Sequence, residues 1–379
     1  MWCAPIALGQ IKLHLKPGAG ETSIVTASDL PNRGLAVVWR ANESAFKNGD
    51  WSPVHAFPVK KHAKAGLPLY NAGKNSAFFR LSWQYISLPD QLAWIPPGRF
   101  QMGSPEDEPG RFMDEGPTLK AVVPHGFWMD RYEVTQKNYL NLMGENPSNT
   151  EFSPDMPVNR VTWHEAVEYC MRMTDSKRSA GLLPKGYVYR LPTEAEWELA
   201  ARSGTTSEFW SGNGEALGGD YASADWYCDG TEVITDGVEP PLQDYAWYCS
   251  YEDSAQPVGQ LLPNGYGLYG MHGNLWEWCA DGYGDYPEYE SINPLGSFDA
   301  LYRVCRGGGW RSEGHLCRCA TRLRGAPDGQ FKDVGFRPAI RFETNDVWES
   351  FDKQITHEIA KSSYGKIDKE GRKRREGSF

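Results

Sequence analysis

The sequence predicts a loop-rich globular protein in which short strands come first and short helices follow. Aromatic residues make up 13% of the 379-residue chain, which is too many for a disordered protein. Glycine contributes 40 residues and proline 26, which argues against a bundle of long helices. No stretch approaches the roughly 18 consecutive apolar residues that a membrane span requires. We therefore expect a core built largely from aromatic rings, whose polar atoms need specific hydrogen-bond partners.

Charge is unevenly distributed along the chain. Residues 1–88 hold 10 Lys/Arg and 4 Asp/Glu, whereas residues 89–343 hold 21 and 38. An acidic middle segment repels phosphate, so we expect no nucleic-acid partner there. The same excess of carboxylates suits bound cations, or it serves only to keep the protein soluble.

The cysteines and the start of the chain bear on where the protein works. Eight cysteines are present without a C-x-x-C pair, and Cys317-x-Cys319 is too tightly spaced for a usual zinc site. Partial disulfide pairing in an oxidising compartment is the better interpretation. Met1–Leu8 is apolar but short, so it is at best a weak export signal. We expect a secreted or cell-surface protein.

Both ends of the chain differ from its middle. Residues 1–88 predict a small antiparallel β accessory domain without a catalytic constellation, because β-rich runs alternate there with turn residues. Residues 344–379 predict an amphipathic helix, in which apolar residues recur every four positions, followed by a basic tail. That helix either packs on its own domain or binds a partner. The strands expected in the first segment are Ser23–Ala27, Leu35–Arg40, Val54–Val59 and Ser76–Trp83, and the apolar positions of the helix are Val347, Phe351, Ile355 and Ile359.

The middle segment contains three helix starts with clear capping signals. A threonine precedes the helices expected at Gln136–Met143 and Trp163–Met173, and the second of these has a Thr-x-x-Glu capping box. Another such box begins a third helix at Thr193. Near the end of the segment, Phe336–Phe342 alternates and predicts a closing strand, which Pro338 would push to the edge of a sheet.

An ordered series of motifs runs across about residues 93–343: Phe127–Thr135, Pro157–Trp163, Tyr189–Glu198, Asn264–Tyr269, His272–Trp278, Arg306–Trp310 and Gly335–Arg337. This series resembles the formylglycine-generating enzyme, or sulfatase-modifying-factor, family. The resemblance implies an irregular α+β fold related to C-type lectins, occupying a domain of residues 89–343. Fold alone does not settle function, since this family includes copper-dependent oxidases as well as proteins without known chemistry.

Only one of the two copper-binding positions of the family is a cysteine in this sequence. The resemblance implies two Cu(I)-binding cysteines, five residues apart, after the Arg-Gly-Gly motif. Here these positions are Ser312 and Cys317. Soft thiolates select Cu(I), and a serine hydroxyl is a poor ligand for it. We therefore predict no copper, and Cys317 would be catalytic only if the protein were an oxidase after all.

The resemblance also implies a calcium site, held by Gly273, Leu275 and Glu277. Calcium prefers oxygen ligands, which backbone carbonyls of a tight turn and the Glu277 carboxylate would supply. Gly270 stands where a side-chain ligand usually sits, so one oxygen is missing unless water replaces it. The alternative is that Glu277 only hydrogen-bonds neighbouring backbone amides and braces the layer of Trp276 and Trp278.

The disulfide bonds that the resemblance implies are not kept either. Cys170 is present, but Pro338 stands at the position of its partner. Cys319 is also present, but Ala201 stands at the position of its partner. Because Cys279 and Cys317 both flank the aromatic centre, we expect these two to pair instead.

The most consistent function is a non-catalytic one, in which an exported bacterial protein binds a protein, peptide or glycan on a lectin-like scaffold. The loop from Trp310 to Arg322 matches where the enzymes hold substrate, so exposed rings and arginines there would contact the ligand. Internal ion pairing with the acidic excess is the alternative role for these arginines. Two other functions stay open: a copper-dependent oxidase acting on a cysteine peptide, and self-assembly through the β domain and the C-terminal helix. The expected ligand-binding residues are Trp310, Arg311, Ser312, His315, Arg318 and Arg322.

Overall fold

The structure is a computed structural model that describes two parts of the chain. Between residues 12 and 84 it describes six strands. It then describes residues 91–149, 152–183, 186–212, 240–249, 254–297 and 299–342. The helix expected in the C-terminal tail lies outside the described residues.

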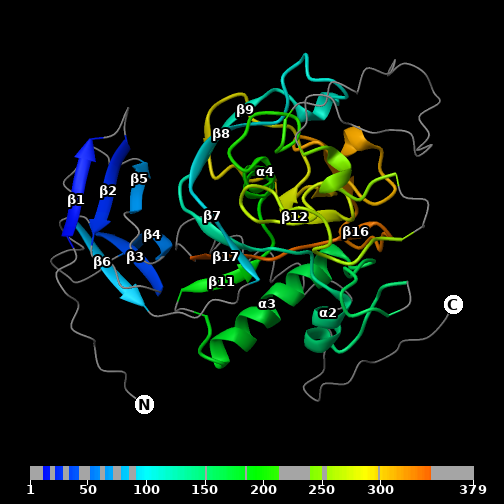
Figure 1. Ribbon diagram of the computed structural model, residues 1–379, viewed down its shortest axis with the longest axis horizontal. Helices are drawn as coiled ribbons and strands as arrows, with labels where there is room; N and C mark the ends of the chain where they lie inside the picture. Colours follow the sequence, from blue (N-terminus) through cyan, green and yellow to red (C-terminus); the bar gives the residue numbers. More distant parts are fainter. Residues whose placement is uncertain are drawn as a thin grey trace.

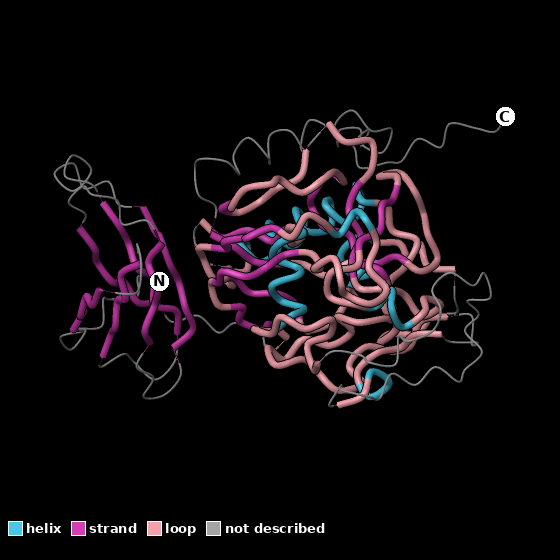
Figure 2. The backbone as a smooth tube through the Cα atoms, turned by 90° about the horizontal axis from the view of Figure 1, so that it is seen from above, coloured by secondary structure: helices cyan, strands magenta, loops and turns pink. Residues whose placement is uncertain are grey.

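The six N-terminal strands form two three-stranded antiparallel sheets, with the orders β1-β2-β5 and β4-β3-β6. Figures 1 and 2 show these sheets to one side of the larger body. The four strands expected from the sequence are confirmed, and the structure adds β1 and β5. Their bounds are Lys12–Pro17 for β1, Thr22–Ser28 for β2, Gly34–Ala41 for β3, Ser52–Val59 for β4, Ala65–Tyr70 for β5 and Phe78–Gln84 for β6.

A four-stranded sheet with the order β11-β17-β10-β7 joins the beginning of the larger body to its end (Figure 1). The closing strand β17 is confirmed, but its expected edge position is wrong, because it pairs with β11 on one side and β10 on the other. Pro338 stands just before the strand, where it donates no ladder hydrogen bond and its carbonyl accepts one from Asp130 N at 3.0 Å. The strands are Leu92–Ile95 for β7, Phe127–Asp130 for β10, Tyr187–Arg190 for β11 and Ala339–Phe342 for β17.

Two smaller sheets complete the body. In the sheet ordered β15-β14-β12-β16, every residue of β12 is buried, so this strand forms the centre of the core. The other sheet has the order β13-β9-β8. Their bounds are Gly98–Met102 for β8, Leu119–Val123 for β9, Trp276–Gly282 for β12, Ser291–Ile292 for β13, Arg303–Arg306 for β14, Arg322–Gly325 for β15 and Val334–Gly335 for β16.

The three helices begin where their threonine caps predict. They are α2 (Gln136–Met143), α3 (Trp163–Ser179) and α4 (Glu194–Arg202), and α3 and α4 each have the expected capping box. Helix α3 runs past the expected Met173, because the Thr174 hydroxyl on its buried side accepts a hydrogen bond from Tyr189 N of β11. Short helices, small sheets and long loops confirm the α+β class.

Aromatic rings fill the core, as the composition predicts, and the polar atoms of several of them have specific partners. Trp163, Trp197 and Trp278 are all completely buried. The indole N–H of Trp163 donates to the Cys279 carbonyl at 2.8 Å, and that of Trp278 donates to the Val161 carbonyl at 2.9 Å. Each ring therefore contributes buried apolar area and also ties two distant segments together.

Five described cysteines, Cys170, Cys279, Cys305, Cys317 and Cys319, are buried free thiols. The expected bond between Cys279 and Cys317 is therefore wrong. Cys279 lies on β12 and packs with Trp197 and Val304, whereas Cys317 packs with Phe209 in a different part of the core. The broader expectation of partial disulfide pairing stays a prediction.

Candidate functional site

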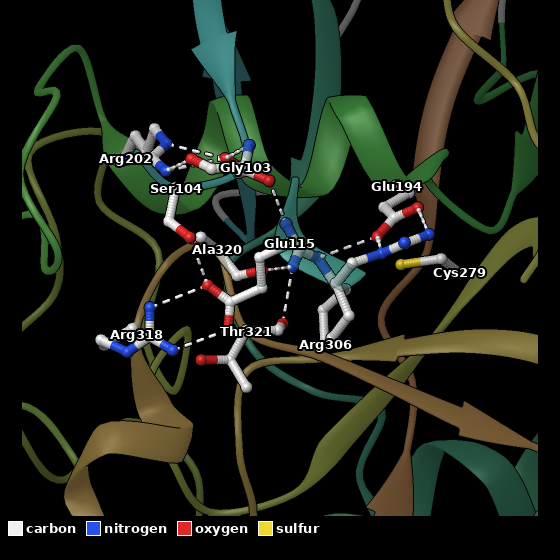
Figure 3. A network of polar contacts seen from close by, with 12 residues as sticks. Gly103, Ser104, Glu115, Glu194, Arg202, Cys279, Arg306, Arg318, Ala320 and Thr321 are labelled. Carbon is white, nitrogen blue, oxygen red and sulfur yellow. Dashed lines mark hydrogen bonds and ion pairs between the residues drawn. The ribbon is translucent and has the colours of Figure 1, made fainter. Parts of the chain in front are cut away.

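Helix α4 brings buried carboxylates into the centre of the site region (Figure 3). Glu194 and Glu198 are one helical turn apart and share a face. Glu194 accepts hydrogen bonds from Arg322 at 2.6 and 2.9 Å, whereas Glu198 accepts one from Arg202 at 2.8 Å and pairs with Arg306. Although burial would raise the pKa of Glu194, the charge of Arg322 holds it below its usual value. Three arginines thus neutralise two carboxylates inside the protein.

Glu196 projects from the opposite side of α4 into a second buried cluster. Arg190 donates to both carboxylate oxygens at 2.7 and 2.8 Å, and Arg341 donates to Oε1 at 2.8 Å. Burial alone would raise the pKa of Glu196, but the charges of Arg190 and Arg341 lower it to about 2. This cluster joins α4 to the ends of β11 and β17, so it is part of the scaffold and not an open site.

Arg318 fastens an acidic loop onto the segment that carries the family's copper position (Figure 3). Its guanidinium donates to both oxygens of Glu115 at 2.6 and 2.9 Å, to Glu108 at 2.5 Å and to the Gly110 carbonyl at 2.6 Å. Its Nε donates to the His315 carbonyl at 2.9 Å. The arginine is completely buried, so it serves as an internal clamp.

These contacts correct the sequence-based picture of the ligand-binding loop. The exposure expected of its rings and arginines is wrong except at Arg311, whose side chain is 54% exposed and pairs with Asp333. The reason is that Arg318 and Arg322 neutralise buried glutamates, which was the alternative role. The other five residues expected to bind ligand are all buried: Trp310, Ser312, His315, Arg318 and Arg322.

The copper position shows no thiolate pair. Ser312 is buried, and its hydroxyl accepts a hydrogen bond from Gly309 N at 2.9 Å. Burial raises the pKa of the Cys317 thiol, whose Sγ donates to the Glu313 carbonyl at 3.8 Å. Across the described residues, no three His, Cys, Asp or Glu side chains come together as metal ligands. Because Cu(I) needs soft ionised sulfur, the groups at this position do not fit it.

His272 is a core residue beside this position and not a base. Its Nδ1 lies 2.6 Å from the Cys317 carbonyl, and its ring packs against Phe209 and Tyr245. Burial lowers the pKa of His272 to about 4, so the imidazole is neutral near pH 7.

In the turn that was expected to bind calcium, the carboxylate of Glu277 is already paired with a guanidinium. Its carboxylate accepts hydrogen bonds from Arg337 at 2.5 to 2.9 Å and from the indole of Trp197 at 2.8 Å. These partners are an indole and a guanidinium, and not the backbone amides of the alternative role expected for Glu277. Gly273 and Leu275 are buried in the same turn.

Sequence reasoning missed Glu133, a buried carboxylate beside this turn. Its Oε1 accepts a hydrogen bond from Asn274 Nδ2 at 2.8 Å, whereas its Oε2 has no hydrogen-bond partner. The only sequence signal was its place inside the family motif that ends at Thr135. The Glu133 Oε2 atom lies 4.0 Å from Arg337 Nη2, so the two groups form a buried ion pair.

The α+β body, with its short helices, small sheets and long loops around a buried aromatic core, has the C-type-lectin-like fold. Residues 84–342 match the model of the sulfatase-modifying factor enzyme 1-like domain, and the chain belongs to that family. The resemblance drawn from the ordered motifs is confirmed.

The relatives of this chain include enzymes and proteins named for other roles. It is 30% identical over 245 residues to the chaperone protein LppX of Paenibacillus barcinonensis, covering 58% of this chain and 81% of that protein. It is 34% identical over 232 residues to the formylglycine-generating enzyme of Thermomonospora curvata, covering 59% and 67%. Among solved structures, PvdO from Pseudomonas aeruginosa superposes with a TM-score of 0.50 at 25% identity, covering 66% of this chain and 94% of PvdO.

A further structure supports the fold alone. Treponema denticola variable protein 1 superposes with a TM-score of 0.52 at 24% identity, covering 71% of this chain and 96% of that one. Within the part of the chain that the structure describes, no helix is both long enough and apolar enough to cross a membrane.

Proposed function

We propose that this domain is a non-catalytic scaffold that binds a protein or peptide ligand, in a secreted or cell-surface bacterial protein. The observation that carries the proposal is that Ser312 stands at the first copper-cysteine position, with its hydroxyl bonded to Gly309 N, while Cys317 is buried. One sulfur beside a hydroxyl does not supply the pair of soft ligands that Cu(I) requires for oxygen chemistry. The relatives support this reading, since they include a protein named as a chaperone.

An assay for formylglycine tests the absence of catalysis. The full chain is incubated with copper, oxygen and a Cys-x-Pro-x-Arg peptide, and the mass of the peptide is followed. We expect no conversion, because only one sulfur is available at the copper position. The matched variant S312C supplies the second sulfur, and we expect it to bind Cu(I) at least tenfold more tightly. Conversion of the peptide by the wild-type protein would establish the oxidase alternative instead.

Ligand binding needs an exposed surface. Because most of the residues expected to bind ligand are buried, we place the binding surface on exposed side chains next to that loop. Phe112, Met113, Leu301 and Tyr302 are exposed, by 42, 93, 82 and 42% respectively. We call these four residues the apolar patch. Tyr283 links its two halves, because its hydroxyl bonds the Asp114 carboxylate and its N–H donates to the Tyr302 carbonyl at 2.8 Å.

Charge beside the apolar patch indicates what kind of ligand fits. The Arg324 guanidinium lies 5.4 Å from the ring centroid of Tyr302, and the side chain is exposed. Within the described ranges Arg324 makes no ion pair, in contrast to the clamped Arg318 and Arg322. Exposed apolar side chains next to an available guanidinium favour a peptide segment that combines an apolar side chain with a carboxylate.

Selection from a random peptide library, displayed on phage, tests the surface. We expect peptides selected on the wild-type protein to bind M113D and R324E at least tenfold more weakly in a titration. The control variant is R99E, which reverses an exposed charge outside the apolar patch. Selected peptides that bind all four proteins equally, or selection of none, would refute the proposed surface. A ligand found only among glycans would support the other alternative from the sequence.

A further inference from the structure

The two halves of the apolar patch come from segments that are far apart in the sequence. Phe112 and Met113 lie near the end of the acidic loop Glu106–Glu115, whereas Leu301 and Tyr302 lie just before β14. The Met113 side chain is 93% exposed, so its position depends on how the residues beside it are held. A ligand that contacts both halves therefore depends on whatever fixes the distance between them.

One residue, Tyr283, makes a hydrogen bond to each half. Its hydroxyl donates to the carboxylate of Asp114, the residue after Met113, and its backbone N–H donates to the Tyr302 carbonyl at 2.8 Å. Burial, followed by the bond to Asp114, raises the pKa of Tyr283 to about 12, so the hydroxyl keeps its proton near pH 7 and remains a donor. Tyr283 thus joins the two loops directly.

The ring of Tyr283 is itself held by a buried arginine. The Arg322 guanidinium lies 4.7 Å from the ring centroid of Tyr283 and 4.2 Å from that of Tyr286, and it donates to Glu194 of α4 at 2.6 and 2.9 Å. The same guanidinium donates to the Asp114 carbonyl at 2.8 Å. Asp114 is therefore held at two atoms, the carboxylate by Tyr283 and the carbonyl by Arg322, and both contacts lead back to the core.

We propose that Tyr283 is a positioning residue for ligand binding, whose bond to Asp114 holds the Met113 half of the apolar patch in the place that the ligand requires. The inference rests on the proposed function and adds that affinity depends on a hydroxyl that is already bonded inside the protein. A loop held in its bound position before the ligand arrives binds more tightly, because less freedom is lost on binding.

The variant Y283F tests the loop without any ligand. It removes the hydroxyl but keeps the ring over Arg322 and the backbone N–H that donates to Tyr302. We expect trypsin to cleave after Arg111 of the acidic loop faster in Y283F than in the wild-type protein, with the cleaved bond identified by mass spectrometry. Equal cleavage rates in the two folded proteins would overturn the inference.

Binding is then measured with phage-selected peptides whose affinity M113D lowers at least tenfold. We expect these peptides to bind Y283F about tenfold more weakly, since the lost bond was made to a carboxylate. D114A removes the other partner of this bond but keeps the carbonyl that Arg322 contacts. The double variant Y283F/D114A should bind little more weakly than either single variant, because all three lose the same bond. A general loss of stability would not produce this non-additivity, and urea unfolding confirms that each variant is folded.

The matched control is Y289F, which makes the same chemical change at a tyrosine that is 74% exposed and not part of the apolar patch. We expect it to bind and to be cleaved like wild type. If M113D weakens binding but Y283F does not, or if the losses in Y283F and D114A add, the surface stands and the positioning role is overturned. If no peptide is selected, or if none responds to M113D, the proposed function fails and this inference fails with it.

Discussion

Replacing Arg318 with methionine is expected to lower the free energy of unfolding by about 3–5 kcal/mol, a large share of what a domain normally has. The substitution keeps the apolar stem but leaves the carboxylates of Glu108 and Glu115 buried without their cation. It also leaves the Gly110 carbonyl without its donor. Urea unfolding, followed by tryptophan fluorescence, measures the change.

The control for this experiment is R311M in the same loop. Arg311 also makes an ion pair, at 2.7 Å with Asp333, but its side chain is 54% exposed. A solvated pair of this kind contributes about 0–1 kcal/mol, so R311M should unfold nearly like wild type. If R318M and R311M lose the same stability, the buried clamp does not hold the acidic loop.

The contrast between these arginines explains which features the sequence could predict. Helix starts were predictable, because a threonine cap and its glutamate lie three residues apart and act locally. The partner of Arg318 was not, since Glu115 lies 203 residues away along the chain. The composition of the acidic segment from Glu106 to Glu115 likewise did not reveal that Glu115 is buried against an arginine.

The candidate site shows the same limit. The assignment of Ser312 to a position where a thiol would be needed stays a prediction, since it depends only on a count of residues from the Arg-Gly-Gly motif. The expectation of exposed arginines in the loop from Trp310 to Arg322 was wrong, because the net charge of a segment does not show which carboxylates are buried beside those arginines. Glu133 was missed for a related reason: its hydrogen-bond partner Asn274 lies 141 residues further along the chain, and the two meet only when their segments are folded together.

The second large effect is expected at Trp197, and truncation to alanine should cost about 3–5 kcal/mol of stability. The ring is completely buried, and the face of the indole lies 5.5 Å from the Arg306 guanidinium. It also fills the space beside Gly307, where an added Cβ would lie 3.0 Å from the ring. Removing the ring therefore opens a cavity between α4 and the Arg-Gly-Gly turn. This cavity lies next to buried ion pairs, whose attraction weakens if water enters.

A second variant separates the cavity from the lost hydrogen bond. W197F retains most of the ring but removes the N–H that donates to Glu277 at 2.8 Å, so we expect it to cost about 1–3 kcal/mol. Y302A, which truncates an exposed ring, should change stability by only about 0.5 kcal/mol. All three are compared by chemical denaturation. Equal losses for W197F and W197A would mean that the hydrogen bond to Glu277, and not the packing of the ring, holds α4 against β12.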